Sequence, residues 1–189
     1  MTPRLSAEAR REQILAAVLP VVLDHGLTIT TRRLAEAAGV AEGTLFRSFD
    51  DKEALLRAVL ERELFESLSC EGLAERFETV EALVDAAMGV LVPRFARMSR
   101  ATAALGSLIR PEEPEIFRRF VRLHEEVAGR FTPFAAQLRV GTDAAAELLL
   151  SLCSTAGTRW GTPGRRASPE EIRAVLLHGL VDEERRRAR

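Results

Sequence analysis

The segment from Thr30 to Leu56, TTRRLAEAAGVAEGTLFRSFDDKEALL, constrains the fold more than any other part of the chain. Within it, Leu34, Ala35 and Ala38 recur at the spacing of one narrow apolar helix face, and Gly39 follows directly. A residue just past a helix end often needs a positive φ, which glycine adopts without a Cβ penalty. The pattern therefore predicts a short helix that ends in a tight glycine turn.

A second and a third helix are predicted directly after this turn. Leu45 and Phe49 are four positions apart and therefore share one face of a helix that extends from Ala41. Asp51 can cap the third helix, which we expect to continue to about Ser69. Two short helices joined by a glycine turn form a helix-turn-helix, whose second helix can lie in the major groove of DNA. The alternative interpretation is an ordinary corner between two helices of an all-helical domain.

The residues outside these apolar faces favour DNA binding over the helical corner. Most of them are short hydroxyls or cations, which are the side chains that contact phosphates and base edges. The candidate DNA-binding residues are Thr30, Thr31, Arg32, Glu42, Gly43, Thr44, Phe46, Arg47, Ser48 and Lys52. Arg32 is the best candidate to read a base, because its guanidinium fork matches O6 and N7 of guanine. The side chains expected to hold phosphate oxygens are Thr31, Thr44, Ser48 and Lys52.

Two members of this set, Glu42 and Phe46, differ in chemistry from the rest. Glu42 could accept a hydrogen bond from cytosine N4, but a carboxylate close to phosphates also weakens binding, and both hypotheses stay open. Phe46 can offer only apolar contact, for example with a thymine methyl group.

Residues at fixed spacing form a longer pattern through this region. They are Gly26, Thr30, Thr31, Arg32, Leu34, Ala35, Ala38, Gly39, Val40, Gly43, Thr44, Leu45, Phe46, Phe49, Lys52, Glu53, Ala54 and Leu55. The pattern resembles the tetracycline-repressor (TetR) family of one-component transcriptional regulators, and the resemblance spans residues 10–64. It implies a three-helix DNA-binding head on a larger, sequence-variable helical domain that dimerises and binds an inducer. It also implies that the protein acts as a repressor.

The chain departs from the family pattern at three positions. Phe46 replaces the usual tyrosine, which removes a phenolic phosphate contact. Ala41 replaces the usual serine cap of the recognition helix. Pro20 interrupts the first helix, which we expect from Ser6 to about His25, and should kink it on its solvent side.

The charge of the chain limits how it can bind DNA. With a net charge of −1 the protein has no bulk attraction to nucleic acid, so any affinity must come from a local patch. The first 62 residues hold equal numbers of acidic and basic side chains. Lys52 is the only lysine of the chain, and it stands where the family has a phosphate-contacting lysine. This balance disfavours a non-specific binder but is compatible with a sequence reader whose cations share one face.

The cysteines and histidines give no sign of catalysis or metal binding. Cys70 and Cys153 belong to no CxxC motif or histidine cluster, so we expect buried, inert thiols. His25, His124 and His178 are scattered singly, and no GxSxG, HExxH or phosphate-loop motif occurs. We therefore predict no enzyme activity, no metal and no cofactor. The sequence has neither an apolar run of about 18 residues nor a signal-peptide core, so the expected location is the cytoplasm, with no membrane as partner.

The predicted elements are all helices, because no strand alternation or internal repeat occurs. The fold class is therefore all-α, with an N-terminal helix-turn-helix head on a larger helical domain. We expect residues 1–50 to bind DNA, residues 51–69 to form a linking helix, and residues 70–189 to bind an effector and dimerise. In this second part, helices are predicted over residues 79–98 with a bend at Pro93, 101–109, 114–137 with a break near Gly129 and Pro133, 142–156, and from a capping box at Ser168 onward.

The apolar faces of the second part predict a cavity for an inducer. The candidate ligand-binding residues are Phe95, Met98, Ile109, Phe117, Phe120, His124 and Phe131. Because polar groups are few on these faces, the expected ligand is a hydrophobic or amphipathic small molecule. Its binding would shift the helix that begins at Lys52 and change the separation of two heads. The alternatives are ordinary core packing for the phenylalanines and a structural role for His124.

Two apolar stripes near the C-terminus predict a homodimer. They contain Leu148, Leu149, Leu152, Val175, Leu176 and Leu180. Doubling these two helices about a two-fold axis gives an intersubunit four-helix bundle, in which Gly179 would allow close approach. Two heads related by that axis require a palindromic operator in double-stranded DNA. Together with the resemblance, which implies repression, these patterns predict a repressor that releases its operator when an inducer binds. The alternative is a helical protein-interaction module without specific DNA binding.

Overall fold

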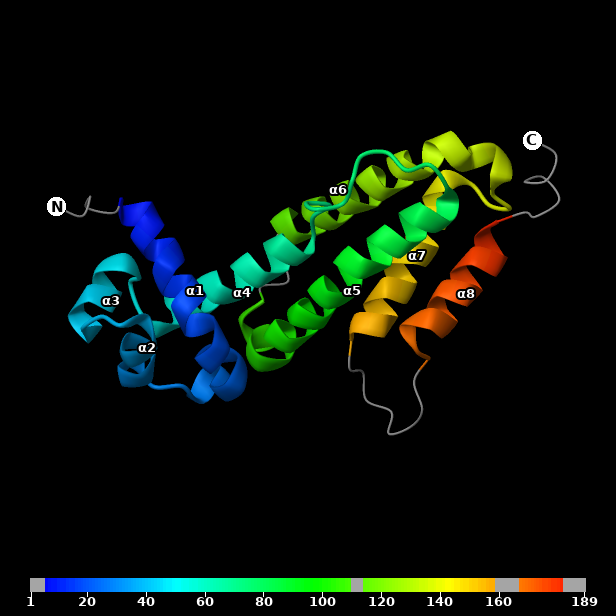
Figure 1. The fold of residues 1–189 in the computed structure, drawn as a ribbon. Helices are drawn as coiled ribbons and strands as arrows, with labels where there is room; N and C mark the ends of the chain where they lie inside the picture. The colour runs from blue at the N-terminus through cyan, green and yellow to red at the C-terminus, as the bar shows by residue number, and fades with distance from the viewer. Residues whose placement is uncertain (1–5, 110–113, 159–166, 182–189) are drawn as a thin grey trace. The chain divides into compact units, whose positions relative to one another are not determined.

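The computed structural model describes residues 6–109, 114–158 and 167–181, and within these ranges it contains helices and no strand. The eight α-helices are α1 Ala7–His25, α2 Thr31–Ala38, α3 Glu42–Ser48, α4 Lys52–Ser67, α5 Val80–Leu105, α6 Pro114–Phe131, α7 Thr142–Gly157 and α8 Pro169–Leu180 (Figure 1). Three short 3-10 helices accompany them: η1 Gly26–Thr28, η2 Gly106–Leu108 and η3 Thr132–Gln137. The all-α prediction is confirmed. A search of the described helices finds none whose length and hydropathy would let it cross a membrane.

The helices belong to two compact units. The head unit contains described residues 6–64 and 100–109, and the body unit contains described residues 65–99, 114–158 and 167–181. Helices α4 and α5 each have residues in both units, so the chain passes between the units within regular secondary structure.

Helices α1 and α4 begin where the sequence places capping residues. The hydroxyl of Ser6 accepts from the amide of Ala9 at the start of α1, and Asp51 accepts from the amide of Ala54 at the start of α4. The apolar face of α1 packs against α2 and α3. The buried apolar residues of this unit include Ile14, Leu15, Val18, Val22, Ile29, Leu34, Leu45, Phe49, Leu55, Leu56, Val59 and Leu60. Arg57 ties α4 to η2 by donating from Nη1 to the carbonyl oxygen of Leu108 at 2.9 Å.

The predicted break between residues 98 and 101 is wrong, because α5 runs unbroken through this stretch to Leu105. Met98, Ser99, Arg100 and Ala101 include no helix breaker, so nothing local ends the helix there. Pro93 lies inside α5 with its ring exposed, and the helix continues past it. The break predicted near Gly129 and Pro133 does occur, because α6 ends at Phe131 and the chain continues as η3.

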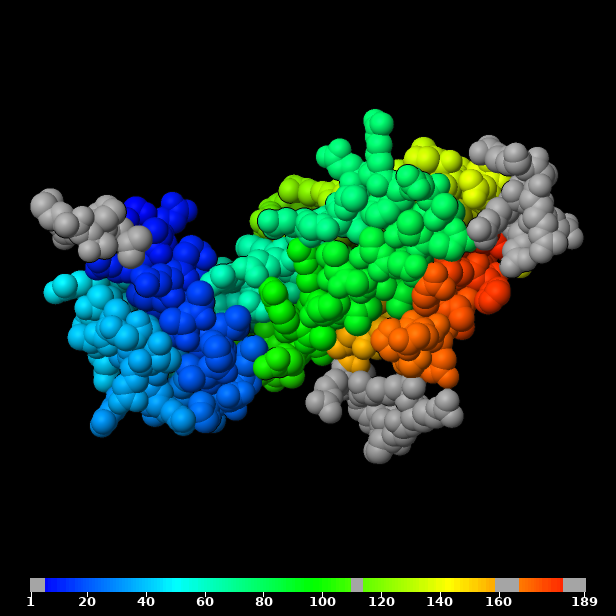
Figure 2. All heavy atoms as spheres, viewed as in Figure 1, coloured from blue at the N-terminus to red at the C-terminus, as the bar shows by residue number. Residues whose placement is uncertain are grey.

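The body unit has its core between α5, α6, α7 and α8. Its fully buried side chains include Leu83, Leu91, Phe95, Leu123, Phe131, Ala145, Leu149, Leu176 and Leu180. The predicted capping box at the start of α8 is confirmed, since Ser168 and Glu171 exchange side-chain and backbone hydrogen bonds. The end of α8 is fixed by Arg139, whose amide donates to the carbonyl oxygen of Leu180 at 2.8 Å. Helix α8 lies along α5 at the surface of the molecule (Figure 2). Arg173 of α8 forms an ion pair with Asp85 of α5.

Both cysteines lie buried in the body unit as free thiols, as predicted. Burial is the main cause that raises the pKa of Cys70 to about 11 and the pKa of Cys153 to about 12, from an ordinary value of 9.0. Since the thiolate is the reactive form, both groups should be inert in the folded protein near neutral pH.

This burial predicts how the thiols respond to reagent and to pH. At pH 8, Cys70 and Cys153 should react with Ellman's reagent far more slowly in the folded protein than in denaturant. The raised pKa values leave the free energy of unfolding unaffected below pH 9, and they lower it as the pH rises through 9 toward 11, because the unfolded chain then releases its thiol protons first. Equal labelling rates in the folded and denatured protein would contradict this assignment.

Candidate nucleic-acid interface

The turn between α2 and α3 holds the two helices in a fixed relation. Gly39 has φ 66°, in the left-handed region that glycine favours. Its amide donates to the carbonyl oxygen of Glu36 at 3.1 Å, and the amide of Val40 donates to that of Ala35 at 3.1 Å. These two bonds form a Schellman motif, which satisfies the last carbonyl groups of α2. Thr30 caps the other end of α2 by accepting from the amide of Arg33, so the predicted short helix is held at both ends.

Helix α3 presents a polar and small-residue face to solvent. Leu45 and Phe49 are buried, as their spacing predicts, and they anchor the helix to the head core. The exposed residues of this segment are Ala41, Glu42, Gly43, Phe46 and Arg47, while Thr44 and Ser48 are half-buried. No side chain caps the start of α3, because Ala41 stands at the N-cap. Helix α3 is thus held by its buried face and by contacts at its C-terminal end.

Arg11 fixes the C-terminal end of α3, and the sequence analysis did not identify it. Its Nη1 donates to the carbonyl oxygen of Ser48 at 2.8 Å, and its guanidinium carbon lies 4.2 Å from the centroid of the Phe49 ring. The cation therefore binds a terminal carbonyl of α3 and packs on the residue that ends it. Arg11 and Ser48 are 37 positions apart, so no local pattern in the sequence could have paired them.

Two of the predicted DNA-binding residues already contact carboxylates. Arg32 donates from Nε to Oε1 of Glu36 at 2.9 Å, and this bond raises the pKa of Arg32. Thr31 donates from its hydroxyl to Oε2 of Glu42 at 3.1 Å. The side chain of Arg32 is 81% exposed, so water screens its ion pair strongly. Both donors lie at the surface and can exchange their carboxylate partners for oxygens of DNA.

The other cations of α2, α3 and the start of α4 differ in their contacts with the rest of the protein. Lys52 donates from Nζ to the carbonyl oxygen of Leu27 at 2.8 Å, which ties the start of α4 to η1. Its ammonium group carries two more protons that this bond does not use. Arg33 and Arg47 are exposed, and their side chains form no hydrogen bond or ion pair within the described part of the chain. The structure thus brings the candidates on α2, α3 and the start of α4 together in one head unit.

The candidate inducer residues lie in three different environments. Phe95 and Phe131 are buried in the body core, and Met98 packs against that core. Phe117 and Phe120 are 70% and 47% exposed on α6. Nε2 of His124 lies 3.1 Å from the carbonyl oxygen of Asp143, and this contact links α6 to α7. Ile109 belongs to the head unit. Their assignment to an inducer stays a prediction.

The candidate dimer residues separate into an inner and an outer group. Leu149, Leu176 and Leu180 are buried within a single body unit. Leu148 is 44% exposed and Val175 is 64% exposed. Leu152 is half-buried. The outer faces of α7 and α8 also carry small and polar residues, namely Ser151, Thr155, Ala174, His178 and Gly179. A dimer contact on these helices would therefore use the outer group.

The described residues contain no group of three or more histidine, cysteine, aspartate or glutamate side chains that could hold a metal ion.

Comparison with known proteins bears on the same region. Residues 14–59 match the family model of bacterial regulatory proteins, tetR family. A nucleoid occlusion factor SlmA from Haemophilus ducreyi is 34% identical over 97 residues, which cover 50% of this chain and 48% of that protein. The SlmA protein of Actinobacillus pleuropneumoniae is 37% identical over 62 residues, 32% of this chain and 31% of the relative. The chain thus spans about half the length, or less, of these relatives.

Solved structures share the fold over a much longer part of the chain. A TetR-family transcriptional regulator from Mesorhizobium loti has a TM-score of 0.62 at 16% identity and covers 95% of this chain and 100% of its own. NalD, described as the secondary repressor of the MexAB-OprM multidrug efflux pump in Pseudomonas aeruginosa, has a TM-score of 0.61 at 23% identity and covers 94% and 100%. Residues 14–59 are thus similar to the tetR family of bacterial regulatory proteins, and the fold of the chain is similar to that of these two solved structures.

Proposed function

We propose that the protein is a DNA-binding transcriptional regulator that represses its target genes as a homodimer and releases a palindromic operator when a small apolar or amphipathic molecule binds. The observation that carries this proposal is the polar face of α2 and α3, which the Schellman turn at Gly39 and the contacts of Arg11 hold in place. A corner that served only to pack helices would not need exposed arginines and hydroxyls at these positions. The description of NalD as a repressor supports the repressor role.

In this proposal α3 is the recognition helix and lies in the major groove. Arg32 exchanges Glu36 for guanine, and Thr31 exchanges Glu42 for a phosphate oxygen. Each donor has a carboxylate partner at the exposed surface before DNA arrives, and DNA would replace that partner. Phe46, which is 38% exposed, contributes apolar contact with a thymine methyl group.

The proposed dimer joins α7 and α8 of two chains through Leu148, Leu152 and Val175. These residues lie outside the core of a single body unit, so a second copy can cover them. Residues 1–50 with the linking helix over 51–69 would bind DNA, and residues 70–189 would bind the inducer and dimerise. Because α4 and α5 carry residues of both units, a movement of either helix on inducer binding would involve residues of the head unit.

Replacing Arg32 tests the proposed base reading. In gel shifts with DNA from beside the protein's own gene, Arg32→Ala should cost roughly 1–3 kcal/mol of binding free energy and relax the preference at one base pair. Lys52→Ala should weaken binding to all sequences alike and lower the salt slope by about one. Arg33→Ala is the matched control for base reading, because Arg33 is the next residue of α2 and is also exposed.

Two results would go against this function. If Arg32→Ala leaves the ranking of single-base operator variants unchanged, Arg32 is not a base reader. If the wild-type protein binds no DNA at any salt concentration, the protein is a helical protein-interaction module and not a DNA-binding regulator.

A further inference from the structure

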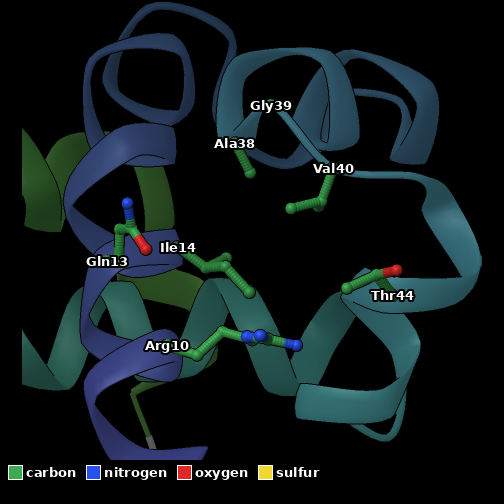
Figure 3. Close-up of a pocket in the computed structure, with 7 residues that line it drawn as sticks. All are labelled: Arg10, Gln13, Ile14, Ala38, Gly39, Val40 and Thr44. Atoms are coloured by element: carbon green, nitrogen blue, oxygen red, sulfur yellow. The ribbon is translucent and has the colours of Figure 1, made fainter. Parts of the chain in front are cut away.

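One pocket of the head unit lies between α1 and the turn that joins α2 to α3. Arg10, Gln13 and Thr44 are among its lining residues, and the side chain of Arg10 extends toward Thr44 (Figure 3). Because Thr44 is an expected phosphate contact, this pocket belongs to the proposed DNA-binding surface. The body unit, in contrast, has a surface that the proposed function does not use.

That surface is the outer face of the N-terminal half of α6. Phe117, Phe120 and Val121 are 70%, 47% and 38% exposed there, and we call these three residues the α6 patch. In the C-terminal half of the same helix the apolar side chains, such as Leu123 and Phe131, are buried in the body core. Phe117 and Val121 are four positions apart, so they are neighbours on the helix surface. A cluster of exposed large apolar side chains is typical of an interaction site.

Two opposite charges lie beside the α6 patch. Arg118, Val121 and Glu125 recur at the spacing of one stripe along a helix. Arg118 donates from Nη2 to Oε2 of Glu115 at 2.8 Å, but its side chain is 60% exposed, so this pair contributes little free energy. The side chain of Glu125 is exposed and forms no hydrogen bond or ion pair with any residue that the structure describes. Both charges can therefore engage a partner that covers the patch.

The order of these groups along the helix fits a second copy of the same helix. Arg118 and Glu125 are about 10 Å apart along the axis, at about 1.5 Å per residue, and Val121 lies near the midpoint. When two copies of α6 pack antiparallel about a two-fold axis at Val121, Arg118 of each copy lies opposite Glu125 of the other. A partner of one charge sign would meet a like charge at one of these two positions. A second copy meets an opposite charge at both.

We propose that the α6 patch binds the α6 patch of a second copy of this chain in an antiparallel contact with two-fold symmetry. This contact does not rest on the proposed function, because it uses none of the candidate DNA-binding residues and none of the proposed dimer residues on α7 and α8. Where the proposed dimer forms, the contact joins one dimer to another. The patch is smaller than a standard protein interface, so the association is weak and depends on protein concentration.

Sedimentation velocity of the full-length protein without DNA, over a wide range of protein concentration, tests the contact. The sedimentation coefficient of the wild type should rise with concentration. Val121→Arg should abolish this rise and leave the species at low concentration unchanged, because it places two unpaired arginines together at the two-fold axis.

A charge exchange tests the antiparallel register. Arg118→Glu and Glu125→Arg should each lower the association constant about tenfold or more, because each change places like charges opposite one another twice. The variant with both changes should associate nearly as the wild type does. Arg33→Glu is the matched control, since it changes the net charge as Arg118→Glu does but lies in the head unit. Circular dichroism checks that each variant keeps its helix content, and Val121→Arg with Glu125→Arg decides the matter if Arg118→Glu does not fold.

Three results would overturn the proposal. They are a wild-type sedimentation coefficient that stays constant with concentration, a Val121→Arg protein that associates as the wild type does, and a double variant that stays as weak as the single ones. A wild type that is monomeric at low concentration would remove the proposed dimer, while the rise with concentration and the charge exchange still decide this contact. A protein that binds no DNA would remove the proposed function and leave this test unaffected.

Discussion

Val175→Arg is expected to convert the proposed dimer to a monomer and to abolish binding to the proposed palindromic operator. Val175 is 64% exposed on α8, and Leu148 is 44% exposed on α7. An arginine at the centre of a dimer contact would bury an unpaired charge, which costs far more free energy than one apolar contact contributes. A monomer then reaches only one half-site, so it loses half of the phosphate and base contacts.

Sedimentation velocity measures the oligomeric state, and gel shifts measure the loss of DNA binding. Val121→Arg is the matched control, because Val121 is also an exposed valine of the body unit but lies on α6. It should leave the protein dimeric. A Val175→Arg protein that stays dimeric and binds DNA as the wild type does would rule out this interface. Leu176→Arg cannot serve as the test, since Leu176 is 2% exposed within one chain and its replacement should unfold the body unit.

Gly157→Ala is expected to lower the free energy of unfolding by about 1–3 kcal/mol or more. Gly157 ends α7 where this helix meets α5. A Cβ atom there would lie 2.6 Å from the carbonyl oxygen of Val92, 2.8 Å from the amide nitrogen of Ala96 and 3.0 Å from Cβ of Phe95. Two of these three atoms belong to the backbone, so a side-chain rotation cannot relieve the clash, and the helices must move apart.

Urea denaturation of Gly157→Ala and of a control variant measures the change in the free energy of unfolding and its sign. Gly89→Ala is the matched control, because Gly89 lies inside α5 and no protein atom occurs within 4 Å of its Cβ position. That change should raise stability by about 0.5–1 kcal/mol through helix propensity alone. If Gly157→Ala is as stable as the wild type, the close packing of α7 on α5 is not real.

The head unit could be predicted from the sequence because its signals are local. Gly39 and Asp51 each act within a few residues of their own position, and the structure uses both as their sequence context predicts. The contact of Arg11 with Ser48 could not be predicted in the same way. It depends on how α1 packs against a helix that lies more than thirty positions later in the chain.

In the body unit, periodicity identified the apolar faces but not what covers them. Leu148 and Leu149 are adjacent, and both fit an apolar stripe, yet only Leu149 is buried within one chain. Phe117 and Phe131 likewise lie in one phenylalanine-rich segment, but the first is 70% exposed and the second fully buried. Helix α5 shows a different limit, because no residue from Met98 to Ala101 breaks a helix and the break predicted there does not occur.

The proposed function requires that the two head units of a homodimer bind a DNA sequence with two-fold symmetry. Selection of bound fragments from a random double-stranded DNA pool by the purified full-length protein, followed by sequencing, tests it most directly. The account predicts enrichment of an inverted repeat whose half-sites lie about one helical turn apart, roughly 34–36 Å, or somewhat more. The same selection with Arg32→Ala should return the repeat with one relaxed base pair in each half-site. A wild-type pool that stays random, or that enriches a sequence without two-fold symmetry, would contradict the account.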